Sequence, residues 1–423
     1  MRDVVNDRRR WAVGCLLLLL LIVPTSRAAT DFSGYWKTYL QAINYPSVEM
    51  LGVSVGLSKE YIFTNRLRLK LEATLPENLE LAVAYDLAPR AYIDGNKSSN
   101  LFSPGFGLLS QIYRVDDLNP EIWEEESGDY GILHNLDRLQ LTLRLPRADL
   151  IVGRQAISWG SARAINPTDI LAPFAYGEID VEDRLGVDAV RLRAPLGLMG
   201  ELDGGMAFGP DLAADNSAWF LRARYFILHT DFFGIISGFR GNTLLGFDLT
   251  RALSGFGSWL EAGYVVVEDD TTVGEHNYWR VSLGADYSLR DGTYLFAEYH
   301  YSEAGVTDPA DYPPLAGLTP YREGGVYLLG RHYLIPGVTR PITPLLTATV
   351  QVITNINLEN PSAYLTVTME YSICDNSYLS WGVYKGAGKG PYPDDDNMFA
   401  APLIGSEFGS YAGRFYFSYR TYF

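Results

Sequence analysis

The sequence predicts an all-β protein: a transmembrane antiparallel up-and-down β-barrel of about 18 strands, with 16 also possible. Three observations predict it. Segments of about ten residues alternate apolar and polar side chains, their connections alternate between short and long, and the last segment is aromatic on one face. The composition agrees, because 29 Tyr, 19 Phe, 8 Trp and 41 Gly favour strands and tight turns over helices.

The closing segment, residues 413–423, separates its side chains cleanly at a period of two. One face carries five residues, Phe415, Phe417, Tyr419, Thr421 and Phe423. The other face carries Arg414, Tyr416, Ser418, Arg420 and Tyr422. A helix would scatter both sets around its surface, so the segment is predicted to be a strand. Period two alone leaves open whether the apolar face packs on a soluble core or meets lipid.

The N-terminus has the pattern of a secretory signal peptide over residues 1–28. A basic start at residues 8–10 precedes an apolar stretch over residues 11–23, and small residues surround the expected cleavage position. The alternative is an N-terminal membrane anchor, but about 13 apolar residues are few for a spanning helix. We therefore expect an exported chain whose residues 29–423 form a single barrel domain.

Several classes of protein are excluded by the rest of the composition. No later window has the ~18 uninterrupted apolar residues of a spanning helix. The formal net charge of −16 is unsuited to nucleic acid. After residue 28 the chain retains one cysteine, Cys374, so no internal disulfide is possible. Residue spacings characteristic of a metal site or a covalently attached haem are missing, so no cofactor and no metal are expected.

Taken in order, the alternating segments predict strands near residues 32–45, 61–75, 79–87, 137–146, 148–159, 186–194, 199–209, 218–228, 230–240, 242–253, 257–269, 277–290, 293–303, 326–335, 342–355, 362–373, 376–386 and 407–423. Residues 48–60 are ambiguous and could hold part of a strand.

The connections then fall into two classes. Every second one is short, at residues 76–78, 147, 195–198, 229, 254–256, 291–292, 336–341 and 374–375. The others include all the long ones, at residues 88–136, 160–185, 304–325 and 387–406. Short turns on the periplasmic side and long loops on the extracellular side are the layout of an outer-membrane barrel. Tryptophans near the predicted strand ends are expected to form interfacial girdles, namely Trp36, Trp159, Trp219, Trp259, Trp279 and Trp381.

These features together resemble the porin-type outer-membrane barrels of Gram-negative bacteria. Residues 153–160 (GRQAISWG), followed by residues 166–169 (NPTD) and Pro173, are similar to an element of porin-like families that lack an assigned function. The C-terminal strand ending in Phe423 is similar to the signal that the barrel-assembly machinery recognises. The resemblance implies a location in the cell outer membrane.

The resemblance also suggests a constriction. In general porins the third long loop folds into the lumen, which here would be residues 160–185. By position, the resemblance implies that the constriction acids are Asp169, Glu178, Asp180, Glu182 and Asp183. The alternative is a solvated acidic surface loop.

If the apolar faces meet lipid, the basic side chains of the other faces line the lumen. A charge at the lipid midplane would cost about 2–4 kcal/mol for Arg or Lys. The predicted pore-lining residues are Arg66, Arg68, Lys70, Arg138, Arg144, Arg191, Arg193, Arg222, Arg224, Arg280, Arg414 and Arg420. Acidic loops at residues 121–129, 178–183, 268–270 and 394–396 would face this wall and create a field across the pore. The alternative is that arginines and acids pair across neighbouring strands.

Three functions follow from these observations. The first is an outer-membrane channel for passive diffusion of small hydrophilic solutes or ions, which involves no enzymatic chemistry. The second is a structural barrel that sheaths or docks a periplasmic or export partner. The third is an outer-membrane hydrolase, for which His300 between Glu298 and Ser302 is the one candidate. Expected partners are the lipid bilayer, lipopolysaccharide and the barrel-assembly machinery, with a homotrimer or a periplasmic protein possible.

Overall fold

The computed structural model describes residues 29–423 except 51–52, 57–58, 76–77, 94–112, 116–120, 125–128, 174–178, 181, 269–272, 358 and 394–401. The predicted signal peptide at residues 1–28 therefore lies outside the described residues, as do Glu178 and the acidic run at residues 394–396. In the described residues, no helix has the length and apolar character needed to cross a bilayer.

The chain forms a closed antiparallel barrel of 18 strands. They are β1 (Ala29–Asn44), β4 (Glu60–Leu75), β5 (Leu79–Ile93), β7 (Tyr130–Leu145), β8 (Ala148–Gln155), β9 (Val187–Leu196), β10 (Gly200–Ala207), β11 (Ala218–Ile227), β12 (Thr230–Phe239), β13 (Asn242–Leu253), β14 (Phe256–Val266), β15 (Tyr278–Ser288), β16 (Tyr294–Ser302), β17 (His332–Thr343), β18 (Leu346–Asn355), β19 (Ser362–Cys374), β20 (Ser377–Ala387) and β21 (Gly413–Tyr422). Each pairs with its neighbours in chain order, which confirms the predicted fold class.

The remaining elements are short and lie in the connections. A hairpin of β2 (Ser47–Met50) and β3 (Val53–Gly56) follows β1, and β6 (Glu121–Glu124) pairs with β7. Helices α2 (Tyr312–Leu315) and α3 (Thr319–Arg322) lie between β16 and β17. The 3-10 turns of the described residues are η1 (Pro210–Leu212), η2 (Ala214–Asn216), η3 (Pro309–Asp311) and η4 (Phe408–Ser410).

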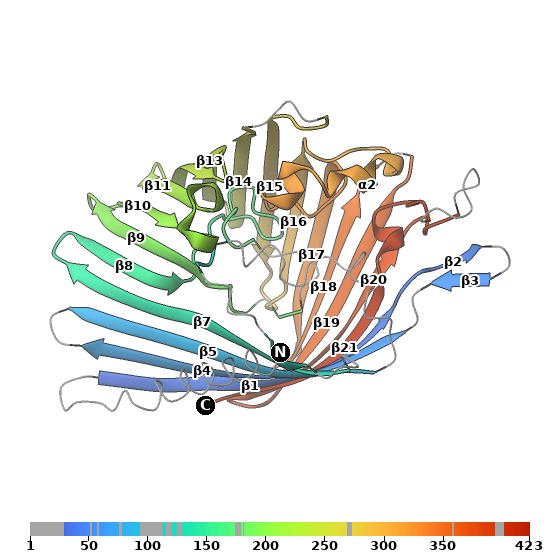
Figure 1. Cartoon of the computed structure of the whole chain (residues 1–423), viewed down its shortest axis with the longest axis horizontal. Coiled ribbons are helices and arrows are strands. Elements are labelled where there is room, and N and C mark those ends of the chain that lie inside the picture. The colour runs from blue at the N-terminus through green and yellow to red at the C-terminus, as the bar shows by residue number, and fades with distance from the viewer. Residues whose placement is uncertain are drawn as a thin grey trace.

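Pairing of the first and last strands closes the barrel. Ten residue pairs join β1 to β21, from Tyr35 with Tyr422 to Asn44 with Gly413. Figure 1 shows the blue β1 and the red β21 next to each other, with the other strands following in colour order around the ring. Gly34 and Phe423 then exchange two backbone hydrogen bonds, at 2.9 and 3.0 Å between nitrogen and oxygen. Because both edges of the barrel sheet are paired here, this sheet has no open edge at the seam.

The two faces of the closing strand separate as the alternation predicts. Phe415 and Phe417 are exposed on the outer surface, whereas Arg414, Tyr416 and Ser418 are buried on the inner side. Other strands behave likewise, with exposed outward leucines on β7, β11 and β15. The outer wall of the barrel is therefore apolar, and its polar side chains turn inward.

Several predicted boundaries are wrong. The strands predicted at residues 79–87 and 137–146 are longer, since β5 runs to Ile93 and β7 begins at Tyr130, and two further differences have local reasons. Residues 336–341 were expected to be a turn because prolines interrupt strand ladders, yet they lie inside β17 and the turn is at residues 344–345. The strand tolerates Pro336 and Pro341 because its pairing with β18 is irregular around them. Residues 407–412 were expected to begin the closing strand but contain η4, so β21 begins only at Gly413.

The tryptophan prediction is also wrong for two of the six residues. Trp36, Trp219 and Trp279 are exposed on the outer wall, and Trp381 on β20 is half-buried. Trp159 and Trp259 are buried inside the barrel, where Trp159 packs against Phe220 with ring centroids 4.9 Å apart. Residence near a strand end does not specify which face a tryptophan occupies, so the sequence could not separate these two from the others.

Gly34 lies at the closing seam, where a side chain would clash with the backbone carbonyl of Arg68 and the ring of Phe423. We expect Gly34→Ala to lower the free energy of unfolding by about 1–3 kcal/mol through this overpacking. Urea titration in detergent, followed by heat-modifiable mobility on gels, measures the effect. Gly234→Ala on β12 is the matched control, because nothing lies within 4 Å of the added carbon. Equal stability of the two variants would contradict the seam packing described above.

Candidate functional site

The connection between β8 and β9, residues 156–186, crosses the interior of the barrel and is called the crossing loop below. On one side the hydroxyl of Ser161 donates to Asp248 of β13, and Arg163 pairs with Asp286 of β15 at 2.9 Å. On the far side Asp180 pairs with Lys37 of β1 at 2.9 Å. The loop therefore divides the lumen, because it contacts the inner wall at opposite sides of the ring.

The element that resembles porin-like families forms the entry into this loop. Gly153 and Gly160 have φ values of 110° and 100°, a backbone conformation that residues with a side chain rarely adopt. A side chain at Gly160 would also clash with Asn166, which packs against it. Gln155 is buried and donates to the carbonyl of Ala189 at 3.2 Å. The element thus turns the chain from the wall into the lumen, a structural role that its sequence did not indicate.

Two buried glutamates, Glu261 on β14 and Glu298 on β16, hold the first half of the crossing loop and are called the carboxylate anchor. Glu261 accepts backbone N–H groups of Ser161, Ala162 and Thr168 at 2.9–3.2 Å. Both glutamates are fully buried, at 0% exposure. Buried carboxylates are stable only when such donors compensate the lost hydration, so the loop backbone and the glutamates require each other.

Glu298 makes an equivalent set of contacts with the next three residues of the loop. It accepts the backbone N–H groups of Arg163, Ala164 and Ile165 at 2.7–3.2 Å. It also accepts the indole N–H of Trp259 at 3.1 Å, which explains why this tryptophan faces inward. Sequence reasoning missed both glutamates as site residues, because an inward carboxylate on a barrel strand carries no sign of which loop it binds.

An apolar cluster fills the space between the first half of the crossing loop and the nearby wall. Loop residues Ile157, Trp159 and Leu171 pack there against Phe220 of β11 and Leu244 of β13, all fully buried or nearly so. Packed side chains therefore fill the space between the first half of the loop and this part of the wall.

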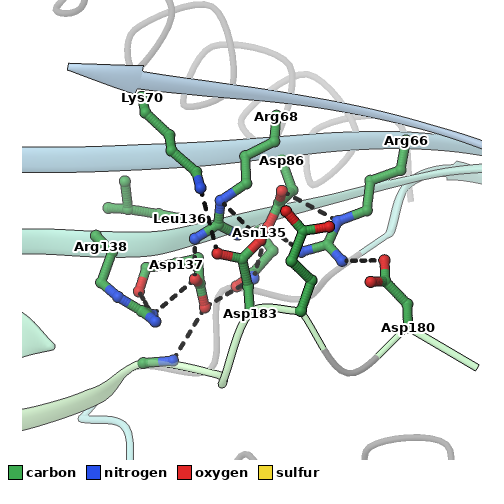
Figure 2. A network of polar contacts seen from close by, with 12 residues as sticks. Arg66, Arg68, Lys70, Asp86, Asn135, Leu136, Asp137, Arg138, Asp180 and Asp183 are labelled. Carbon is green, nitrogen blue, oxygen red and sulfur yellow. Dashed lines mark hydrogen bonds and ion pairs between the residues drawn. The ribbon is translucent and has the colours of Figure 1, made fainter. Parts of the chain in front are cut away.

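The second half of the loop is held by charges. The basic residues are Lys37 on β1 with Arg66, Arg68 and Lys70 on β4, and the acidic ones are Asp180, Glu182 and Asp183. We call this set the ionic anchor. Figure 2 shows Arg66, Arg68 and Lys70 pointing toward the loop carboxylates Asp180 and Asp183. Four of the five predicted constriction acids are thus placed in the interior, since Asp169 is also fully buried and pairs with Arg184 at 2.8 Å.

Arg68 is the centre of the part of this network that extends into the wall. Its guanidinium is 1% exposed and pairs with Asp86 at 2.9 Å, Asp137 at 2.5 Å and Asp183 at 3.6 Å. Asp86 also accepts from Arg66, and Asp137 pairs with Arg138 at 2.6 Å. A buried arginine surrounded by three carboxylates is strongly held, because removing one partner would leave an uncompensated charge.

Asp180 is ionised at all physiological pH values. Burial alone would raise its pKa, but Lys37 and Arg66 lower the pKa of Asp180 to about 2. The same opposition applies to Asp183, whose pKa is lowered by Arg68 despite burial. Asp169 behaves differently: burial raises the pKa of Asp169 to about 6, against the lowering effect of Arg184.

Most of the predicted pore-lining cations pair with a carboxylate of the protein. Besides those of the ionic anchor, ion pairs join Arg144 to Glu80, Arg191 to Asp203, Arg193 to Glu201, Arg224 to Asp231 and Arg420 to Glu370. Arg222 lies over the ring of Phe233, Arg280 donates to the Gly324 carbonyl at 3.1 Å, and Arg414 is buried. The ion-pairing alternative therefore describes the wall better than an unpaired basic surface.

A cavity of about 730 Å³ lies between the crossing loop and the wall formed by β18 to β21. Of the twelve predicted cations, Arg280 and Arg420 border it. Its ionisable lining consists of Arg163, Arg184, Arg280, Arg420, Asp169, Asp180, Glu182 and Glu370. Its tyrosines are Tyr39, Tyr327, Tyr384, Tyr416 and Tyr422. The remaining polar lining is mostly threonine, serine and glutamine from the wall.

A third buried carboxylate, Glu407, fixes the loops at residues 303–331 and 388–412. It accepts the backbone N–H of Leu329 at 2.8 Å, the hydroxyl of Tyr333 at 2.6 Å and the amide of Asn355 at 2.8 Å. Burial raises the pKa of Glu407, and the donated hydrogen bonds oppose that rise. These two loops are therefore held to each other and to the wall near the cavity, where Tyr327 is part of the lining.

The geometry around His300 is that of a packing group. His300 and Ser282 are buried neighbours, with 2.9 Å between Nδ1 and the hydroxyl oxygen. The Ser282 hydroxyl donates to the carbonyl of Ile165 at 2.6 Å, so His300 must supply the proton of the shared bond. A histidine that donates to serine is not placed to activate it as a nucleophile. Among the described residues, no cluster of three or more His, Cys, Asp or Glu could hold a metal ion.

Comparisons with known proteins place this fold among porin-type barrels. No family model matches the chain, and no curated protein sequence does. Solved structures are similar over 93% of this chain. OccK9 (OpdG) of Pseudomonas aeruginosa has a TM-score of 0.55 at 13% identity over 98% of its chain, and OccAB4 of Acinetobacter baumannii has 0.54 at 10% over 98%. A BenF-like porin of Pseudomonas fluorescens has 0.53 at 11% over 99%. The chain thus has the fold of porin-type outer-membrane barrels.

Glu298→Gln tests the carboxylate anchor. The amide keeps the side-chain volume but turns one acceptor oxygen into a donor that faces backbone N–H groups. We expect the free energy of unfolding to fall by about 1–3 kcal/mol, with faster protease cleavage within residues 156–186. Glu201→Gln is the control, because its partner Arg193 is 41% exposed and the pair lies outside the loop. Unchanged stability and cleavage in Glu298→Gln would refute the anchoring role.

Asp180→Asn tests the ionic anchor through its pH dependence. A carboxylate whose pKa is lowered on folding stabilises the fold above its unfolded pKa, and that stability is lost as the pH falls through the folded value. We expect the variant to be about 1–2 kcal/mol less stable than the wild type at neutral pH. The difference should disappear as the pH falls from the ordinary value of 3.8 to about 2. Asp231→Asn, in a pair outside the loop, is the control. A difference that does not vary with pH would show that charge is not the cause.

Proposed function

We propose that this chain is an outer-membrane channel through which small hydrophilic solutes diffuse passively. The observation that carries the proposal is the cavity of about 730 Å³ inside the closed barrel, bounded by the crossing loop and the wall of β18 to β21. Similarity to the folds of porins supports it further. Solutes would pass beside the loop, on the side opposite the apolar cluster.

In this mechanism the protein does no chemistry on the solute. The width of the cavity, the hydrogen-bonding groups on its wall and the charges on the loop decide what passes. The proposal excludes an enzymatic role, and the donor geometry of His300 toward Ser282 supports that exclusion. The loop anchors would keep the constriction at a constant size while solutes collide with it.

The proposed location is the outer membrane, with the apolar outer wall in contact with acyl chains. The short turns would face the periplasm and the long loops the exterior, as in other outer-membrane barrels. Export by a cleaved signal peptide at residues 1–28, insertion by the barrel-assembly machinery through the strand ending in Phe423, and contact with lipopolysaccharide belong to the same proposal. The cavity favours a channel over a scaffold that sheaths a partner, because sheathing needs no passage.

Planar bilayer recordings of the detergent-extracted protein test the channel, and one pair of variants tests the route. Thr349 faces the cavity from β18, and the next residue, Val350, faces outward. We expect Thr349→Trp to reduce single-channel conductance several-fold, because the indole would occupy the passage. Val350→Trp should leave the conductance unchanged.

Each outcome has a distinct meaning. Folded wild-type protein that shows no conductance would refute the channel. Conductance that survives in Thr349→Trp would retain a channel but move the route away from the wall of β18 to β21. Loss of conductance in both variants, with normal heat-modifiable mobility, would contradict the assignment of inward and outward faces on β18.

A further inference from the structure

The wall that faces the crossing loop is a continuous surface of neutral hydrogen-bonding groups. Strand register places Thr349 beside Thr368, Gln351 beside Thr366, and Ser380 beside Ser418. All six side chains border the cavity. They come from four consecutive strands, β18 to β21, so the hydroxyl and amide groups form one patch. A patch of this kind can bond a polar solute at many positions along the passage.

Several of these groups can form further hydrogen bonds. Ser380 is 7% exposed, and its buried hydroxyl has no hydrogen-bond partner among the described residues. Over the same described part of the chain, the side chains of Thr368 and Ser418 form no hydrogen bond with another protein group. A buried hydroxyl without a protein partner destabilises the folded state unless water or a solute forms a hydrogen bond with it. The wall can therefore form hydrogen bonds with a solute that has its own donors and acceptors.

Tyrosine rings border the same patch. Tyr384 and Tyr416 lie next to each other with ring centroids 5.9 Å apart, and Tyr39 and Tyr422 line the cavity with them. A tyrosine offers an apolar ring face together with a hydroxyl. This combination suits solutes whose surface also alternates C–H faces and hydroxyl groups, as the rings of sugars and the chains of polyols do.

The charged lining is compensated by partners within the protein. Arg420 pairs with Glu370 and Arg184 with Asp169, while Asp180 and Glu182 both pair with Lys37. Arg163 pairs with Asp286, and Arg280 bonds the Gly324 carbonyl and is near enough to Asp169 for its charge to act on that carboxylate. The four arginines and four carboxylates of the lining therefore offer an ion little unpaired counter-charge.

This arrangement penalises ions more than neutral solutes. An ion that enters loses part of its hydration and must either remain uncompensated or break an existing pair, and both are costly. A neutral polyhydroxylated solute exchanges its bonds to water for bonds to the wall, which is nearly balanced. We infer that the passage selects uncharged polyhydroxylated solutes of monosaccharide size over anions and cations of similar size. This inference rests on the proposed channel function and names its substrate class.

Two measurements on the reconstituted full-length protein test the inference. Liposome swelling compares uptake of arabinose and glucose with uptake of sodium gluconate, which has a similar size and a charge. Reversal potentials in a potassium chloride gradient report the preference between cations and anions. We expect faster swelling in the sugars by several-fold and a permeability ratio close to one for the two ions.

Two variants connect these results to the named residues. Thr368→Val removes one wall hydroxyl at constant shape and should slow sugar uptake about three- to tenfold, the factor for one lost hydrogen bond, with little change in ion conductance. Thr421→Val, on the outward face of β21, is its control. Glu370→Gln removes the carboxylate that pairs with Arg420. It should raise the ratio of anion to cation permeability several-fold, as measured by the reversal potential. Glu201→Gln, in a pair that does not border the cavity, should not.

The failures of the inference and of the channel proposal are distinguishable. Folded protein that shows neither ion conductance nor swelling refutes the channel. Ion conductance with a strong preference for one sign in the wild type, or gluconate uptake as fast as sugar uptake, overturns the inference and retains the channel. Sugar uptake that is unchanged in Thr368→Val, while it still exceeds gluconate uptake, overturns the assignment to the hydroxyl wall.

Discussion

The closure of the sheet between β1 and β21 is the constraint on which the rest of the structure depends. A sheet whose outer face is apolar cannot leave backbone groups unpaired at an edge in a hydrocarbon environment, where each would cost several kcal/mol. The ten pairs of the seam, extended by Gly34 and Phe423, remove that edge. Closure with an even number of strands then puts the start of β1 and the end of β21 at the end with the short turns, so the long loops gather at the other end.

A ring of 18 strands leaves an interior too wide for wall side chains alone to fill. A loop that enters this interior needs hydrogen-bond partners there for its backbone groups. The carboxylate anchor solves this problem for residues 161–168. Glu261 and Glu298 each accept three backbone N–H groups, which are donors that neither a helix nor a sheet uses at this point. Glu407 does the same for Leu329 in a different loop. Buried carboxylates on the inner wall thus replace secondary structure as partners of the loop backbone.

The barrel could be predicted from the sequence because alternation is a local property, and the strands of residues 242–253 and 362–373 agree with the structure to within a residue or two. The interior could not, because its contacts depend on register and on the path of loops. Arg68 meets Asp86 only because β4 and β5 pair in that register. Period two separates the arginines from the apolar face, but it does not show that carboxylates from neighbouring strands and from the crossing loop pair with them. Glu261 and Glu298 look like any other inward glutamates until the loop is in place.

The two anchors differ in how many arrangements they permit. The carboxylate anchor binds backbone N–H groups whose positions along the chain are fixed, so a shift of the loop by one residue would break several bonds together. The ionic anchor has exchangeable partners, since Asp180 contacts both Lys37 and Arg66, and Asp183 contacts both Arg68 and Lys70. Each of these carboxylates therefore keeps an opposite charge nearby if one of its two contacts breaks. Ile179, Asp180 and Glu182 border the cavity from the ionic side. Both halves of the loop are therefore held in place, and the cavity lies between the loop and the wall of β18 to β21.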